Sequence, residues 1–504
     1  MQKNITRILT LLVLLTLIPL AAEAQKIITY EAGLGRRDKR NPDTWILCRE
    51  VRAEHEGMVL YADSALMNTT HNDFTAFNDI EIILSDTTFI YGNELYYDGN
   101  SRVVDIWDDT VIFIDGATIL KTDHLSFDRK TNKAFYNTWG HTTNAGDTLD
   151  SQIGIYDATQ REVLIYDRVV LRDSASRLET DTLLYHVGTE TADFRSPTYI
   201  FSDTTTIYSE RGSYFTKQRY ALSTKSSFVK TGGRTLTCDT LHYFENDECG
   251  KAQGNVVLFD SLNNVTCMGH YGETNQKTRS SFVTGGAMVT YVKDNDTLFM
   301  HADTIHVTNN KSNDVERIRA HYGVRLFRHD VQAICDSAHF MVPDSNLFLH
   351  HNPTLWQNAQ QCTADTIVLH TTSNGVRQAD LNGHCFVIER IDPEKYNQIK
   401  GNNARVHFAD NDPVYADILG NAEMVYYITE EIPGKGTAII GVNVGVGSDM
   451  RIYFQRREPN RVVTYRDPDM RTYPLSMLPS EKKRLEGFSW RDEQRPHSKE
   501  EIFK

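Results

Sequence analysis

Short alternating runs of apolar and polar residues fill this chain from Trp45 onward. The runs are rich in Val, Ile, Thr, Tyr and Phe, and Asn, Asp and Gly turns separate them. Alternation with a period of two places the apolar residues on one face of an extended strand. Since no segment of the repeat region shows a sustained 3.6-residue apolar period, the pattern predicts an all-β protein of half-buried strands.

The strands recur as a repeat of about 30 residues. One strand pass carries a motif such as Leu236-Thr-Cys-Asp-Thr-Leu-His-Tyr243, and the next is a Gly-led run such as Gly254-Asn-Val-Val-Leu-Phe259. The aspartates of seven copies are Asp63, Asp123, Asp181, Asp239, Asp303, Asp336 and Asp365. Five degenerate copies are centred on Asn93, Ser151, Glu210, Gly269 and Asn402. Twelve copies at a near-constant spacing indicate a repeat architecture.

The motif also predicts a bend in each strand. Counted from the central Asp, apolar or small residues stand at −3, −1, +2 and +4, as in Met300, Ala302, Ile305 and Val307. The step of three shifts the alternation by one residue, which is the signature of a β-bulge. We therefore expect the seven aspartates to be structural, with Asp and Thr side chains bonded to nearby backbone at the bend. Stacked bent strands give an elongated, repeat-built β-jelly roll, that is, a folded, V-shaped sheet of antiparallel strands.

Both halves of each bent strand then face one apolar interior. The expected lining residues are Leu236, Leu241, Tyr243, Val256, Leu258, Met300, Ile305, Val307, Val324, Leu326, Ile367 and Leu369. Small residues at several inward positions, such as Ala62, Gly92 and Ala364, favour an open groove. The alternative is a structural or adhesive β-solenoid with a filled core, which would show the same alternation.

The two ends of the chain differ from the repeat. Lys3 and Arg7 precede an apolar run that ends in Ala22-Glu-Ala24, which predicts a cleaved signal peptide over residues 1–24, with an uncleaved anchor as the alternative. Residues 25–44 are expected as a flexible lead-in and residues 45–430 as the array. Residues 431–504 are expected as strands followed by a charged, Pro-containing tail that caps the array or binds a partner. Within the tail, Ser480 would cap a short helix over residues 481–486.

The composition excludes several classes of function. A formal net charge of −14 does not suit nucleic-acid binding. Seven cysteines in 504 residues do not form a disulfide scaffold, and either free interior thiols or a disulfide between neighbouring strands remains open. The sequence has no metal-binding, phosphate-binding or nucleophile motif, so we expect no cofactor, no metal site and no enzymatic activity. A polysaccharide-acting enzyme on a β-scaffold would need carboxylates clustered on one outer face.

The repeated (Ala/Thr/Cys)-Asp-(Thr/Ser)-(Leu/Ile/Ala) pass and the Gly-led pass that follows it resemble the OstA-like family over residues 61–427. The family contains the periplasmic bridge protein of lipopolysaccharide transport and the periplasmic domain of the outer-membrane translocon. The resemblance implies a periplasmic lipid carrier that can associate with the outer membrane and that shields acyl chains in an apolar groove. It also implies edge-strand contacts with inner- and outer-membrane transport components, and end-to-end self-association. This chain is much longer than a single bridge protein, so that one chain can replace several stacked copies.

Overall fold

The computed structural model describes residues 27–504, apart from 263, 294–295, 313, 373–374, 411 and 433–435. The chain divides into two compact units. Unit 1 extends to Asp203 and includes Phe215–Lys217, and unit 2 comprises Thr204–Tyr214 and Gln218–Lys504. The predicted signal peptide lies outside the described residues. Within the described residues, the structure has no helix with the length and hydropathy that a membrane span requires.

Unit 1 consists of strands joined by short turns. These strands are β1 (Thr29–Glu31), β2 (Leu34–Arg37), β3 (Thr44–His55), β4 (Met58–Asn68), β5 (Asp73–Ser85), β6 (Thr88–Asp98), β7 (Val103–Asp115), β8 (Thr118–Asp128), β9 (Lys133–Tyr136), β10 (Gly140–Asn144), β11 (Asp147–Ser151), β12 (Ile153–Asp157), β13 (Glu162–Arg172), β14 (Arg177–His186), β15 (Thr191–Phe194) and β16 (Thr198–Phe201).

Unit 2 continues the same pattern. Its strands are β17 (Thr205–Ser209), β18 (Arg211–Phe215), β19 (Tyr220–Lys225), β20 (Ser227–Thr231), β21 (Arg234–Cys238), β22 (Thr240–Phe244), β23 (Cys249–Asp260), β24 (Val265–Asn275), β25 (Ser280–Lys293), β26 (Asp296–Asn309), β27 (Val315–Phe327), β28 (Val331–Met341), β29 (Asn346–His350), β30 (Thr354–Gln357), β31 (Gln360–Thr363), β32 (Thr366–Thr372), β33 (Gly375–Arg390), β34 (Tyr396–Ala409), β35 (Asp412–Ile432), β36 (Gly436–Gln455), β37 (Glu458–Tyr465) and β38 (Asp469–Tyr473). Four short 3-10 turns follow, namely η1 (Leu475–Met477), η2 (Ser480–Lys482), η3 (Asp492–Gln494) and η4 (Glu501–Phe503).

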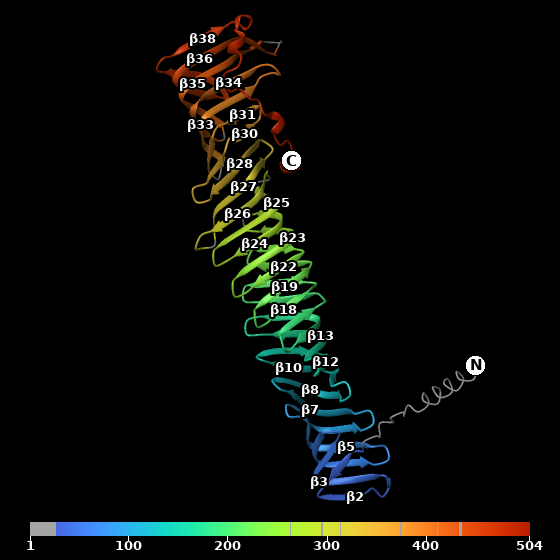
Figure 1. The fold of residues 1–504 in the computed structure, drawn as a ribbon. Coiled ribbons are helices and arrows are strands. Elements are labelled where there is room, and N and C mark those ends of the chain that lie inside the picture. Colours follow the sequence, from blue (N-terminus) through green and yellow to red (C-terminus); the bar gives the residue numbers. More distant parts are fainter. Residues whose placement is uncertain are drawn as a thin grey trace, which may run out of the picture. The chain divides into compact units, whose positions relative to one another are not determined.

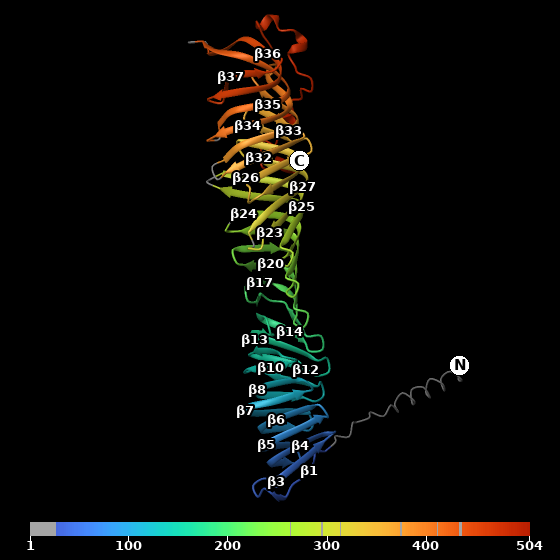
Figure 2. The same cartoon turned by 90° about the vertical axis from the view of Figure 1, so that its left-hand side faces the viewer.

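Each strand pass is one crossing of the sheet, and some passes are divided at the corner into two strands, such as β9 and β10. Within each unit, successive passes pair antiparallel, as β4 does with β5 and β26 with β27. Figures 1 and 2 show the resulting ladders of strands, with turns along both edges. The strands are long because most passes run through the bend without ending. The all-β prediction and the jelly-roll repeat are therefore confirmed.

The lead-in needs a correction. We expected residues 25–44 to be flexible, but β1 and β2 both pair with β3, through Thr29 opposite Glu54 and Leu34 opposite Cys48. The reason is that β3 begins the array and presents a row of unpaired backbone groups on its outer edge. The polar lead-in satisfies those groups, although its own side chains are largely exposed.

The C-terminal segment 474–504, here called the strap, runs back along the outer face of unit 2 from β38 toward β28 and β30 (Figure 1). Three glutamines on that face hold it. Gln398 accepts a 2.9 Å hydrogen bond from the Leu485 backbone N–H, Gln361 accepts a 2.7 Å bond from that of Arg491, and Gln332 accepts a 2.7 Å bond from the Arg495 guanidinium.

Apolar contacts complete the packing of the strap. Leu485, Phe488 and Trp490 lie against the buried side chains of Phe386, Ile388 and Tyr396. From the sequence we expected this tail to cap the array or to bind a partner. In the structure it covers a side of unit 2. The expected helix over residues 481–486 is only the 3-10 turn η2, because the backbone there follows the sheet surface rather than closing on itself.

Candidate functional site

In most repeats, two consecutive residues in the left-handed region build the bend of the second pass. Gly254 and Asn255 have φ of 74° and 46°, and Gly383 and His384 have φ of 77° and 46°. At these positions the strand register shifts by one residue, between Gln253 and Val256 in the first case. The extra residue therefore lies in the Gly-led pass, opposite the motif aspartate of the preceding pass.

The motif aspartates bond across this corner. Asp239 accepts a 2.9 Å hydrogen bond from the Asn255 side-chain amide, and Asp365 lies 3.0 Å from the His384 ring nitrogen. A Cβ atom at Gly254 would lie 2.3 Å from an Asp239 carboxylate oxygen. The corner thus requires glycine both for its φ and for the close approach of the aspartate.

All seven motif aspartates lie on the outer side of the corner. Asp63, Asp181, Asp239, Asp303, Asp336 and Asp365 are exposed, and Asp123 is partly buried beside the Thr138 hydroxyl. Asp336 lies 3.5 Å from the His351 ring, and Thr284 donates a 3.0 Å hydrogen bond to the Asp303 carbonyl oxygen. Their contacts are those of a structural bend, although the carboxylates of Asp239 and Asp365 bond mainly to side chains of the next strand rather than to unpaired backbone.

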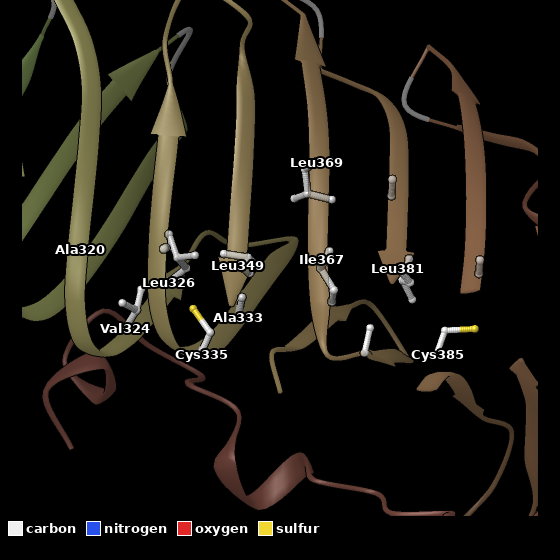
Figure 3. Packing of buried hydrophobic residues seen from close by; sticks show 14 of the residues in the cluster. Ala320, Val324, Leu326, Ala333, Cys335, Leu349, Ile367, Leu369, Leu381 and Cys385 are labelled. Carbon is white, nitrogen blue, oxygen red and sulfur yellow. The ribbon is translucent and has the colours of Figure 1, made fainter. Parts of the chain in front are cut away.

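Inside the bend, inward side chains from successive strands meet in one apolar cluster of unit 2. Met300 lies opposite Leu326, Ile305 opposite Ala320, and Val307 opposite Ile318. Figure 3 shows Val324, Leu326, Ala333, Cys335, Leu349 and Ile367 on neighbouring strands. The buried members of this cluster are Ala, Val, Leu, Ile, Met and Cys, with no aromatic residue among them.

The expected lining residues divide by burial into two groups. Buried are Leu241, Val256, Ile305, Val324, Leu326, Ile367 and Leu369. Partly exposed are Leu236, Tyr243, Leu258, Met300 and Val307. Seven of the twelve join one cluster, namely Leu258, Met300, Ile305, Val324, Leu326, Ile367 and Leu369.

Sequence reasoning missed the C-terminal part of this cluster. Met450 and Ile452 of β36 extend it beyond the predicted end of the array at residue 430, opposite Ile418 and Ala416 of β35. The alternation of Met450, Ile452 and Phe454 carried the signal, but the Asp motif is absent there. The register pairs Ala416 with Ile452 and Ile418 with Met450, so these residues face the same interior.

The cysteines contribute to the lining as small apolar groups. All seven are free, and Cys238, Cys267, Cys335 and Cys385 are buried. Burial raises the pKa of the Cys335 and Cys385 thiols to about 12 and that of Cys267 to about 11. A buried thiol that stays protonated is unreactive, which favours the interpretation of free interior thiols over inter-strand disulfides. Among the described residues, no group of three His, Cys, Asp or Glu side chains is placed to hold a metal ion.

Comparison with known proteins gives two family matches. The family described as OstA-like protein matches residues 25–181, and the family described as LptA/(LptD N-terminal domain) LPS transport protein matches residues 269–375. Together the two stretches cover just over half of the chain. A search of curated proteins gave no match.

One similar solved structure is LptH of Pseudomonas aeruginosa, described as the LptA-homologous periplasmic component of the lipopolysaccharide transport device. It is 16% identical, covers 29% of this chain and 95% of its own, and superposes with a TM-score of 0.22. The two family matches fall one in each unit, and the second contains Met300, Ile305, Val324 and Ile367 of the lining. The chain belongs to the OstA-like family of lipopolysaccharide-transport proteins.

Proposed function

We propose that this chain is a periplasmic bridge for lipopolysaccharide, and that the apolar interior of unit 2 shields the acyl chains. The observation that carries the proposal is the single cluster of inward aliphatic side chains from β24 to β36, whose outer members are partly exposed. It lies largely in the stretch that matches the transport family.

The physical need for such an interior follows from the hydrophobic effect. Each methylene group of an acyl chain in water costs about 0.8 kcal/mol relative to an apolar environment. A chain of about a dozen carbons thus costs on the order of 10 kcal/mol. An aliphatic groove removes this cost without any covalent step, which is consistent with the match of residues 269–375 to a family described as a lipopolysaccharide transport protein.

The partners proposed for this bridge are components of the transport system at the two membranes. The first and last strands support edge-to-edge pairing, because β2 has four exposed residues and β38 carries four exposed residues of five. An exposed strand edge offers backbone N–H and C=O groups to a strand of another protein. The same edges would serve end-to-end self-association, and residues 1–24 would direct export to the periplasm.

A pair of matched variants tests the function. Phe at Ala320 and Ala338 would fill the groove at two neighbouring strands, since the two residues lie opposite each other in β27 and β28. Native mass spectrometry of the purified full chain with lipopolysaccharide should show bound lipid for the wild type and about a tenfold loss of affinity for A320F/A338F. The control His339→Phe replaces an imidazole by a phenyl ring on the outward side of β28, beside Phe348, and should bind normally. Absence of lipid on the wild-type chain would refute the proposal.

A further inference from the structure

The interior of unit 1 differs from that of unit 2, because large aromatic side chains fill it. Phe74, Tyr97, Phe113, Phe127 and Tyr185 are each at most 1% exposed. The aliphatic inward residues between them, such as Ile82, Ile90 and Leu95, are fully buried as well. Because these rings are large as well as buried, they fill the space between the two halves of the bent strands.

Hydrogen bonds between polar side chains, here called clasps, join the two edges of unit 1. One edge carries the turns after β3, β7 and β10, and the other carries the turns after β6, β8 and β12. Tyr97, at the second edge, has its hydroxyl 2.6 Å from the His55 ring nitrogen at the first edge. The Arg129 guanidinium donates to the Tyr97 hydroxyl at 2.9 Å and to the Glu56 carbonyl oxygen at 3.1 Å.

Two further clasps follow along unit 1. The Tyr156 hydroxyl donates to the Asp115 carboxylate at 2.6 Å, and the Tyr185 hydroxyl donates to the Asp147 carboxylate at 2.7 Å. Thr216 donates to the same Asp147 oxygen at 2.7 Å. Hydrogen bonds to a carboxylate are stronger than neutral ones, and these sit over a buried aromatic interior.

The first strands of unit 2 resemble unit 1 in this respect, because the side chains of Tyr243 in β22 and Thr205 in β17 interact across the two edges. From β23 onward, the inward side chains nearest the edges are partly exposed, as at Leu258, Met300 and Phe408.

The sequence changes at the same point. The residue four places after the motif centre is aromatic in five of the first seven repeats, at Tyr97, Phe127, Tyr185, Tyr214 and Tyr243, and is Met67 or Ile155 in the other two. In the five later repeats it is aromatic only at Phe340, and is Glu273, Val307, Leu369 or Val406 elsewhere. Aromatic residues at this inward position therefore become rare where the partly exposed lining begins.

We infer that the acyl chains of the lipid occupy only unit 2, from β23 to β37, and that unit 1 is a filled segment held shut by tyrosine clasps. This inference rests on the proposed function and adds to it the position and the extent of the lipid site. Unit 1 then contributes a rigid segment and a pairing edge, and lipid passes through it only if the clasps open.

Hydrogen exchange of the full chain, with and without purified lipopolysaccharide, tests the inference. At a lipid concentration about ten times the dissociation constant, exchange in residues 249–465 should slow about tenfold, while residues 58–201 stay unchanged. Comparable slowing in residues 58–201 would overturn the inference and leave the proposed function standing. No slowing anywhere would overturn both.

The clasps are tested separately without lipid. The double variant Tyr156→Phe, Tyr185→Phe keeps both rings and removes both hydroxyl donors, so exchange in residues 147–186 should become faster. The control Tyr96→Phe removes a hydroxyl from an outward, exposed ring of the same unit and should change nothing. If the double variant exchanges like the wild type, the clasps do not hold unit 1 shut.

Discussion

At the scale of single residues, the repeat depends on the corner between two strand passes. The Asp motif was visible in the sequence, and so was the phase shift that predicts a bend. The sequence did not show that the extra residue lies in the neighbouring Gly-led pass, because a phase count on one strand cannot tell which strand of a pair is bulged. The structure assigns it to Gly254 and Asn255, opposite Asp239.

The geometry of this corner predicts that Gly254→Ala lowers the stability of unit 2 substantially. An alanine would hold φ at 74° against its preference and would place a methyl group 2.3 Å from the Asp239 carboxylate. Together these effects should lower the free energy of unfolding of unit 2 by about 2–3 kcal/mol, measured by urea denaturation. The control Gly323→Ala has φ of 60° but no atom within 4 Å of the new methyl group, and should cost about 1 kcal/mol. Equal costs for the two variants would argue against the carboxylate contact.

The buried carboxyl group of Asp147 should make the stability of unit 1 depend on pH. Burial raises the pKa of this carboxyl group, against the opposing hydrogen bonds from Thr216 and Tyr185. The folded state therefore holds the proton more tightly than the unfolded chain. The contribution of Asp147 to the stability of unit 1 is therefore most favourable below the usual aspartate pKa of about 4. It becomes less favourable as pH rises from there through the raised pKa of the folded state.

Asp147→Asn should remove that dependence, because an amide oxygen still accepts both hydrogen bonds but carries no charge. Thermal unfolding from pH 3.5 to pH 7 should show the variant gaining on the wild type by about 1.4 kcal/mol per unit of pKa elevation. A difference that stays constant over this range, or that shrinks as pH rises, would contradict the assignment.

At the scale of elements, the strands were predictable and the strap was not. The alternation of apolar and polar residues determines each strand pass and the face it buries. The strap has no periodicity of its own, and its place follows from apolar residues on the outward face of β33 to β35, such as Ile388 and Val425. Those residues look like ordinary strand residues in the sequence, because the sequence does not tell which face of a strand lies inside.

Removing the strap's apolar contacts should therefore loosen unit 2. The variant Phe488→Ala, Trp490→Ala uncovers Phe386, Ile388 and Tyr396, and should cost about 2–4 kcal/mol of strap docking. Limited proteolysis should then cut residues 478–500 much faster, and an apolar dye should bind the exposed face. Met477→Ala is the control, since that side chain is 70% exposed and should leave the digestion pattern unchanged. Unaltered proteolysis of the double variant would mean that polar contacts, including those with Gln332, Gln361 and Gln398 of the sheet, hold the strap without these apolar contacts.

At the scale of the molecule, the repeat, the all-β fold and the family were predictable from the sequence, and the two kinds of interior were not. Both units share the same alternation of inward apolar residues, which says where side chains point but not how fully they fill the space. The difference lies in the size of the inward residues, as between Tyr97 or Phe127 in unit 1 and Val307 in unit 2. All twelve expected lining residues nevertheless lie in unit 2, where we propose the lipid groove.

Photo-crosslinking in cells from Ile305 tests the central claim most directly. Ile305 is 1% exposed, faces the cluster and lies opposite Ala320, whereas Arg319 on the neighbouring strand is exposed on the outer face. A photoreactive residue at position 305 should give an adduct with lipopolysaccharide, identified by mass, and the same residue at position 319 should give none. Adducts at neither position, or equal adducts at both, would contradict a lipid held inside unit 2.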